Sequence, residues 1–161
     1  MDSGDRLPVH DPPHASYPDD WHALALDQHR QVRIAFERAD RATEPDARDA
    51  ALDALCLVLN GHAIAEELVL YPALVLAGST EFAELAYAEQ TTIKIQMAQL
   101  RSFDPADPAW PQALASIRED VLNHMRKEEL TWLADLLSRD VDHDELARQF
   151  REEFDRYTRP R

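Results

Sequence analysis

The pattern His-x-x-x-Glu-Glu-Leu occurs twice in this chain, as His-Ala-Ile-Ala-Glu-Glu-Leu at residues 62–68 and as His-Met-Arg-Lys-Glu-Glu-Leu at residues 124–130. Residues four apart lie on one face of an α-helix, one turn above each other. Each repeat therefore predicts an imidazole beside a carboxylate, His62 with Glu66 and His124 with Glu128. Such a pair can bind one ion or serve two adjacent ions.

The apolar residues around these pairs indicate that their side chains point into a protein core. His62 and His124 each continue an apolar series at helical spacing, and His29 falls within a third. The three series are Leu52, Leu55 and Leu59; Leu114, Ile117 and Val121; and Leu26 and Val32. One histidine in an apolar stripe is usually a hydrogen-bonded core residue, but three inward histidines with two inward carboxylates are costly to bury unpaired. A bound cation removes that cost, and this mixture of ligands suits iron, manganese or zinc.

Helical periodicity extends over most of the chain, and no alternating run rich in Val, Ile and Thr indicates a strand. Pro45 suits a first helical turn, Gly78 suits a helix C-cap, and the sequence Asp-Pro-Ala-Asp-Pro at residues 104–108 is a clear turn. Pro72 lacks an N–H and is expected to end or kink the second helix just past Glu66. The predicted helices span about residues 20–42, 45–76, 81–103 and 109–138. Their lengths and short loops predict an all-α fold, an antiparallel up-down four-helix bundle.

Two further segments flank this bundle, which is expected to occupy residues 19–139. Residues 1–18 hold four prolines and few large apolar groups, which is typical of a disordered or surface-draped arm. Residues 140–161 place Leu146, Phe150, Phe154 and Tyr157 on one stripe among charged residues. An amphipathic helix of this kind needs a partner surface. It is expected either to dock on the exterior of the bundle or to support a homodimer or another protein complex.

The charge balance excludes some classes of partner. The chain has 31 acidic residues against 17 Lys and Arg, a formal net charge of -14 at pH 7. Nucleic acids and anionic membranes attract basic surfaces, so neither is an expected partner. Cys56 is the single cysteine, the N-terminus lacks the pattern of a signal peptide, and no apolar run approaches the roughly 20 residues of a membrane helix. We therefore expect a cytoplasmic protein.

The order of these residues resembles that of hemerythrin-like (HHE cation-binding) domains over about residues 21–137. The resemblance also includes the run Glu-Glu-Leu-Val-Leu-Tyr-Pro-Ala-Leu at residues 66–74, while residues 89–90 and 151–157 resemble a bacterial subgroup of that family. It implies an antiparallel four-helix bundle around a carboxylate-bridged, non-haem di-iron centre that binds O2 or reacts with oxidants. By this resemblance one iron would be bound by His29 and His62, the other by His124, and both would be bridged by Glu66 and Glu128. Zinc and manganese are permitted by these ligands, but the resemblance favours iron.

The chain departs from that family in its third helix, where Gln90 stands in place of a histidine. Lys94 stands in place of a further histidine found in true hemerythrins. Gln90 lies on the same face as Ala86, Ile93 and Met97 and is expected to point inward. An amide is a weak ligand, so a second metal would keep one imidazole and the shared carboxylates.

Several groups could complete the second half of such a centre. The candidates are Glu129, which follows the second His-Glu pair, Tyr87, one turn before Gln90, a water molecule, or an external ligand. The ligands expected for the first metal, His29, His62, Glu66 and Glu128, are all present in the sequence. A mononuclear or an asymmetric dinuclear iron site therefore stays open beside a symmetric pair.

These residues predict a non-haem iron-binding protein that handles or senses oxygen, peroxide, nitric oxide or iron, rather than a turnover enzyme. Reversible O2 carriage, as in true hemerythrin, uses more imidazoles than this chain offers. The position left open by Gln90 could admit peroxide or nitric oxide, which favours a role in the response to oxidative or nitrosative stress. Two alternatives stay open: a small oxidoreductase that decomposes peroxide or oxidises iron at the same site, and an interaction module with a vestigial metal site.

Overall fold

The computed structural model describes residues 20–159, and every regular element in that range is a helix. The all-α class predicted from the sequence is confirmed. The predicted arm, residues 1–18, lies outside the described residues. The elements are α1 (Trp21–Arg41), α2 (Pro45–Ala65), η1 (Glu66–Leu70), α3 (Tyr71–Leu76), α4 (Thr80–Ser102), α5 (Trp110–Lys127), η2 (Glu128–Trp132), α6 (Leu133–Leu137) and α7 (His143–Thr158), where η1 and η2 are π-helical turns.

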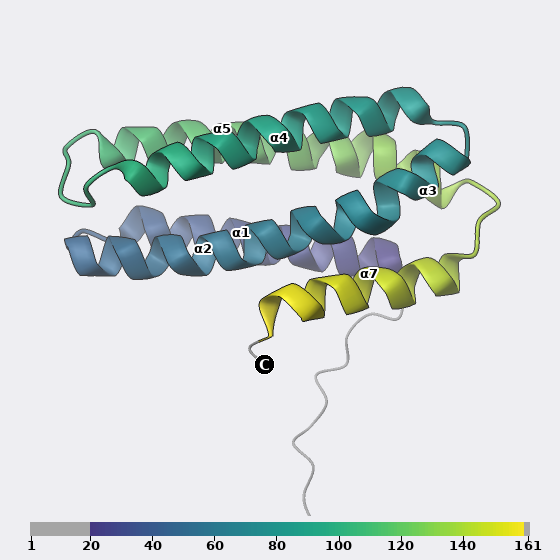
Figure 1. Cartoon of the computed structure of the whole chain (residues 1–161), viewed down its shortest axis with the longest axis horizontal. Coiled ribbons are helices and arrows are strands. Elements are labelled where there is room, and N and C mark those ends of the chain that lie inside the picture. The colour runs from purple at the N-terminus through teal and green to yellow at the C-terminus, as the bar shows by residue number, and fades with distance from the viewer. Residues whose placement is uncertain (1–19, 160–161) are drawn as a thin grey trace, which may run out of the picture.

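The long helices lie along one axis of the molecule in two layers, α1 with α2 and α4 with α5 (Figure 1). Two apolar clusters form the core, which lies between the layers and at one end extends under α7. One contains Trp21, Tyr71, Trp132 and Phe150, and the other gathers around Phe36 near the opposite end. On each of the four long helical segments a few polar residues separate the two clusters, so the core is interrupted by one polar layer at mid-length.

The helix ends follow local sequence signals. The Asp20 side chain accepts a hydrogen bond from the His22 amide at 2.8 Å, and the Asp142 side chain caps α7 in the same way. Gly78 adopts a φ of 91°, and the Ser79 amide bonds the Leu74 carbonyl at 2.8 Å. The C-cap residue is Ala77, and Gly78, predicted as the cap, lies one position later in the left-handed conformation that favours glycine.

Both His-x-x-x-Glu pairs end where the helix widens into a π-helical turn. The Tyr71 amide bonds the Glu66 carbonyl, and the Leu133 amide bonds the Glu128 carbonyl, each spanning five residues. The expected end or kink at Pro72 takes another form, because the helix bends through η1 and continues to Leu76. Pro72 lies in the first turn of α3, where a missing N–H is tolerated. The other π-helical turn, η2, forms without a proline, so a π-helical turn in this chain does not require one.

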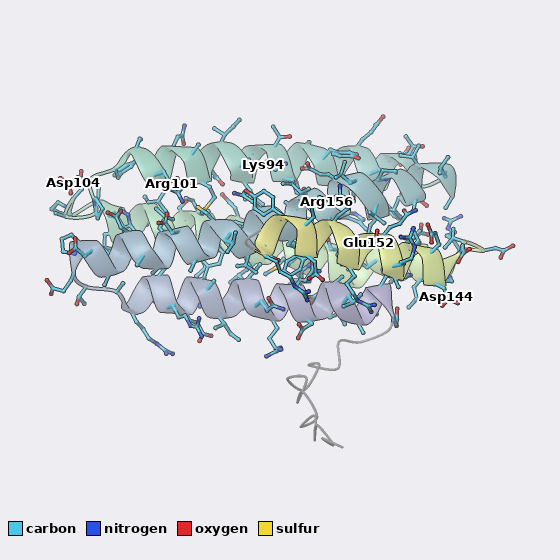
Figure 2. All side chains as sticks on the ribbon, turned by 60° about the horizontal axis from the view of Figure 1, so that its bottom comes forward. Lys94, Arg101, Asp104, Asp144, Glu152 and Arg156 are labelled. Carbon is cyan, nitrogen blue, oxygen red and sulfur yellow. The ribbon has the colours of Figure 1, made fainter. Side chains whose placement is uncertain are left out.

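The helix α7 docks on α1, α2 and η1, as the views in Figures 1 and 2 show. Phe150 is fully buried in this contact. The Trp21 indole N–H donates to His143 Nδ1 at 2.9 Å and joins the start of α1 to the start of α7. Gly61 lets the last turn of α7 approach α2 closely, since a Cβ there would lie 2.6 Å from Thr158 Cγ2. Of the two expected partner surfaces, α7 thus uses the exterior of its own bundle.

The continuous helical stretch Pro45–Leu76, of 32 residues, is long and apolar enough to cross a membrane by length and composition alone. The expectation that no run approaches that length is therefore wrong. In the structure 61% of its most apolar 18-residue window is buried inside the protein. Such burial is that of a core helix, which is apolar because it packs against its neighbours.

Gly61→Ala should reveal the close approach of α7. Alanine normally stabilises a helix interior by about 1 kcal/mol relative to glycine, but its methyl here would displace Thr158. We expect that gain to be lost in the wild-type background and recovered in a Thr158→Ala background. Chemical denaturation of the four proteins measures this coupling. An equal effect of Gly61→Ala in both backgrounds would contradict the tight contact.

Candidate metal centre

The polar layer between the two apolar clusters contains one or two side chains from each of the four long helical segments. None of them is more than 5% exposed, and the members are His29, His62, Glu66, Gln90, His124 and Glu128. The α1 face that brings His29 inward runs through Ala25, Gln28 and Val32. Leu26, expected in that series, falls off the face and is 37% exposed.

Four of these side chains converge on one point, with ligand atoms that all lie within 4.8 Å of one another: His29, His62, Glu66 and Glu128. Each presents one buried atom that makes no hydrogen bond to the described residues, although His29 Nε2 lies 3.2 Å from Glu128 Oε2 and His62 Nε2 lies 3.2 Å from Glu66 Oε2. These atoms are Nε2 of His29, Nε2 of His62, Oε1 of Glu66 and Oε2 of Glu128. Buried polar atoms nearly always have a hydrogen-bond partner. Four buried atoms at one point that lack one, and that can each ligate a metal, therefore fit a bound cation. Two imidazoles with two carboxylates form a ligand set suited to iron, zinc or manganese.

Each imidazole of the layer is held by its outer nitrogen. In all three rings Nδ1 bonds a side-chain oxygen outside the layer, so that Nε2 faces inward. The pairs are His29 with Glu129 at 2.8 Å, His62 with Gln28 at 2.9 Å, and His124 with Glu89 at 2.9 Å. Partners of this kind fix the tautomer and orientation of metal-binding histidines.

Two of the outer partners are carboxylates, and each also contacts a cation. Arg33 donates to Glu129 Oε1 at 2.8 Å, and Lys127 pairs with Glu89. With the hydrogen bond from His29 as the largest cause, the pKa of Glu129 falls to about 2. Burial opposes ionisation of Glu89, but Lys127 and His124 outweigh it and lower its pKa. Both carboxylates therefore stay ionised at neutral pH and keep a hydrogen on the imidazole nitrogen that faces them.

Tyr71 and Gln90 occupy the other side of the layer. The Tyr71 hydroxyl donates to Glu128 Oε1 at 2.6 Å and lies 3.1 Å from Glu66 Oε2. The Gln90 amide donates to Glu66 Oε2 and to the Tyr71 oxygen, each at 2.6 Å. His124 Nε2 lies 3.2 Å from Glu128 Oε1 and 3.5 Å from the Tyr71 hydroxyl. Each buried carboxylate thus has one oxygen bonded within the protein and one that is open.

The pKa values of the two buried carboxylates are shifted in opposite directions. Burial, reinforced by the negative charge of Glu128, raises the pKa of Glu66 well above its usual range. Burial also opposes ionisation of Glu128, but His124 and His29 outweigh it and hold its pKa well below the usual range. Burial lowers the pKa of His62 to about 3, so its ring is neutral at pH 7 and available to a metal.

The structure places the remaining predicted candidates away from the open atoms. The Tyr87 hydroxyl donates to the Glu67 carbonyl at 2.7 Å, and the side chain is 37% exposed. Glu129 contacts the outer nitrogen of His29 rather than the centre. The tyrosine that reaches the carboxylates is Tyr71, because the π-helical turn brings a residue five positions after Glu66 back over it.

Three polar residues of this site were missed by the sequence reasoning: Tyr71, Gln28 as a partner of His62, and Glu89 as a partner of His124. A signal existed for two of them. Gln28 precedes His29 on the inward face of α1, and Glu89 precedes the inward Gln90. For Tyr71 an ideal α-helical wheel points elsewhere, so its place depends on η1.

The sequence matches the family model of the hemerythrin HHE cation-binding domain over residues 23–136. The chain belongs to this family. A crystal structure of a hemerythrin HHE cation-binding domain-containing protein from Mycobacterium kansasii has the same fold, with a TM-score of 0.78, 19% identity, and coverage of 86% of this chain and 87% of that one. A DNA nickase from Nostoc sp. is 30% identical over 107 residues, which is 66% of this chain and 30% of that protein. This HHE-family chain therefore matches less than a third of the nickase.

Metal affinity is expected to fall as the pH is lowered. An ion needs neutral imidazoles and ionised carboxylates, whereas the pKa of Glu66 is raised by burial and that of His29, despite burial, by Glu128 and Glu129. Protons therefore compete with the ion below these pKa values, and binding at neutral pH should release protons. Calorimetric titration with ferrous iron or zinc, in buffers of different ionisation enthalpy, counts them. Binding without proton release and with the same affinity from pH 5 to pH 8 would refute this electrostatic account.

Tyr71→Phe should destabilise the metal-free protein by about 1–3 kcal/mol, the cost of leaving a buried acceptor without its donor. The acceptor is Glu128 Oε1. Tyr87→Phe is the matched control, because it removes a hydroxyl bond at the surface and is expected to change stability by no more than about 0.5 kcal/mol. Chemical denaturation compares the two variants. Equal effects would mean that the Tyr71 hydroxyl does not satisfy the buried carboxylates.

Proposed function

We propose that this chain is a hemerythrin-like, non-haem iron-binding protein of the cytoplasm that handles or senses oxygen, peroxide or nitric oxide. Its site lies in an antiparallel up-down four-helix bundle. The observation that carries the proposal is the set of four open, buried atoms on His29, His62, Glu66 and Glu128. Without an ion, two fully buried carboxylates face each other across this point, an arrangement that is costly in an apolar core.

In the proposed centre the first iron is held by His29, His62, Glu66 and Glu128. Bound iron supplies the redox chemistry with dioxygen, peroxide or nitric oxide that the side chains lack. The protein's contribution is to keep His62 neutral, to orient the rings through their outer nitrogens, and to exclude bulk water by burial. These roles follow from contacts of the chain itself.

A second iron, if bound, would have a different environment. On that side Glu66 and Glu128 already accept hydrogen bonds from Gln90 and Tyr71. An ion near His124 must displace or rearrange these bonds, so we propose that the second position binds more weakly than the first. The centre is then mononuclear or an asymmetric pair, which differs from a symmetric carrier of O2.

The nickase activity named for the Nostoc protein is not proposed for this chain. The match covers 30% of that protein, and a formal net charge of -14 opposes binding to a polyanion.

The proposal is tested by metal content per chain, measured by mass spectrometry on protein from iron-supplemented cells, with an absorption spectrum of the same sample. We expect at least one iron, a near-ultraviolet charge-transfer band, and a melting temperature that rises with iron. His62→Ala should lose all three, whereas His22→Ala, a histidine outside the polar layer, should keep them. Protein without iron, or iron retained in His62→Ala, would refute the proposed site.

Reaction with peroxide separates the two functional candidates. A sensor or binder is expected to respond once per centre. Many turnovers of peroxide per iron, abolished by His62→Ala without unfolding, would assign the chain to the oxidoreductases instead.

A further inference from the structure

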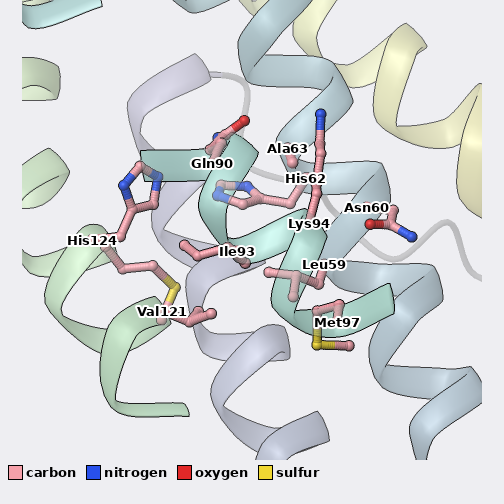
Figure 3. A pocket seen from close by; sticks show the side chains of 11 residues that line it. Leu59, Asn60, His62, Ala63, Gln90, Ile93, Lys94, Met97, Val121 and His124 are labelled. Carbon is pink, nitrogen blue, oxygen red and sulfur yellow. The ribbon is translucent and has the colours of Figure 1, made fainter. Parts of the chain in front are cut away.

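A surface groove between α1 and α5 gathers three arginines, in contrast to the formal net charge of -14 of the whole chain. Its volume is about 370 Å³, which is enough for a small organic molecule. It lies on a different face of the bundle from the pocket that His62, Gln90 and His124 line (Figure 3). The residues that line the groove are Arg33, Glu37, Arg118, Leu122, Arg126 and Glu129.

Two of the arginines have N–H donors that the described residues leave open. Arg126 makes no hydrogen bond or ion pair within residues 20–159. Arg118 makes one ion pair, to Asp40 at 3.7 Å, which is longer than a hydrogen bond. The Arg118 side chain is only 37% exposed, so water reaches its guanidinium less freely than on an open surface. The groove therefore offers two positive groups that lack an acceptor.

The two carboxylates of the groove each already face a cation. Glu37 lies 3.6 Å from Arg41, and Glu129 accepts a hydrogen bond from Arg33 at 2.8 Å. Their negative charge is thus partly compensated, whereas the charges of the two open arginines are not.

An apolar side chain lies between the two open arginines on α5. Arg118, Leu122 and Arg126 follow one another at four-residue spacing, so they share one helix face. Leu122 is partly buried and lines the groove. This face therefore suits a ligand that has an anionic group and a small organic part.

We propose that this groove binds a phosphoryl group, with Arg118 and Arg126 as its main donors. A phosphate ester carries close to two negative charges and three strong acceptor oxygens at pH 7. Guanidinium groups bind such an anion through paired, charge-assisted hydrogen bonds. A carboxylate offers one charge and two oxygens, and so satisfies fewer of the open donors.

Arg33 connects the groove to the metal centre. Its guanidinium donates to Glu129 Oε1, and the same oxygen lies 2.8 Å from His29 Nδ1. An anion that takes hydrogen bonds from Arg33 leaves more of the Glu129 charge to act on His29. Occupation of the groove is therefore expected to alter the centre. This link rests on the proposed metal function, whereas the binding of the anion does not.

The anion site is tested on the full-length, metal-free chain, because phosphate also binds iron. Phenyl phosphate, inorganic phosphate and chloride are added at constant ionic strength, and NMR follows the Arg118 and Arg126 Nε–H groups and the Leu122 methyl groups. Both phosphates should give saturable shifts, and chloride should give none. Tighter binding of phenyl phosphate would assign the groove to a phosphorylated molecule, and equal affinity would assign it to free phosphate. No saturable shift with either phosphate, or the same shifts with chloride, would overturn the proposal.

Arg126→Gln should weaken phosphate binding by about tenfold or more, which corresponds to one hydrogen bond to a charged group. The fold should persist, since Arg126 has no partner in the described part of the chain to lose. Arg38→Gln is the matched control, because it removes the same charge from an exposed position of α1 outside the groove. Equal weakening in both variants would show a general charge effect and refute the site.

The link to the centre is tested in the same titration. The ring nitrogen signals of His29 should shift with the same midpoint as the Arg126 Nε–H signal, and Arg33→Gln should abolish that shift. Unchanged His29 signals in the filled groove would refute the link. A chain that binds phosphate here but no iron would refute the proposed metal function and keep the anion site.

Discussion

Two carboxylates buried in the middle of an apolar bundle impose the constraint on which the other features of this protein depend. Glu66 and Glu128 are fully buried, and an ionised carboxylate in such surroundings costs several kcal/mol unless it is paired. The polar layer answers this cost with three imidazoles, the Tyr71 hydroxyl and the Gln90 amide. Four atoms without a hydrogen-bond partner, on His29, His62, Glu66 and Glu128, face one point that could hold a cation. The layer also divides the core into two apolar clusters.

The two sides of this layer have different chemistry. The side of His29 and His62 offers imidazole nitrogens and carboxylate oxygens without hydrogen-bond partners. On the side of His124 the carboxylates accept hydrogen bonds from Tyr71 and Gln90, and the Gln90 Oε1 atom is the one left without a partner there among the described residues. The Gln90 amide contributes to this difference, since it donates hydrogen bonds to Glu66 and to Tyr71. Weaker metal binding on the side of His124, as proposed above, follows from these hydrogen bonds.

The rigidity of the site comes from groups outside it. Glu89, Gln28 and Glu129 each hold one ring, and two of these partners are themselves neutralised by cations at the surface. Some acidic residues of the chain therefore have a structural role at this site, because the outer carboxylates Glu89 and Glu129 orient the imidazoles and fix their tautomers. The docking of α7 adds a further constraint, since it covers α1, α2 and η1, from which three of the four converging residues come.

The sequence by itself determined the all-α class, the main helix boundaries to within a few residues, and the inward direction of His29, His62, His124 and Gln90. These are local properties, set by a 3.6-residue period and by capping residues. The tertiary structure decided the rest. Tyr71 rather than Tyr87 reaches the carboxylates because η1 changes the helical register, and Glu129 binds the outer side of a ring from another helix. Such contacts depend on a local widening and on distances between helices, neither of which a periodic pattern in one segment encodes.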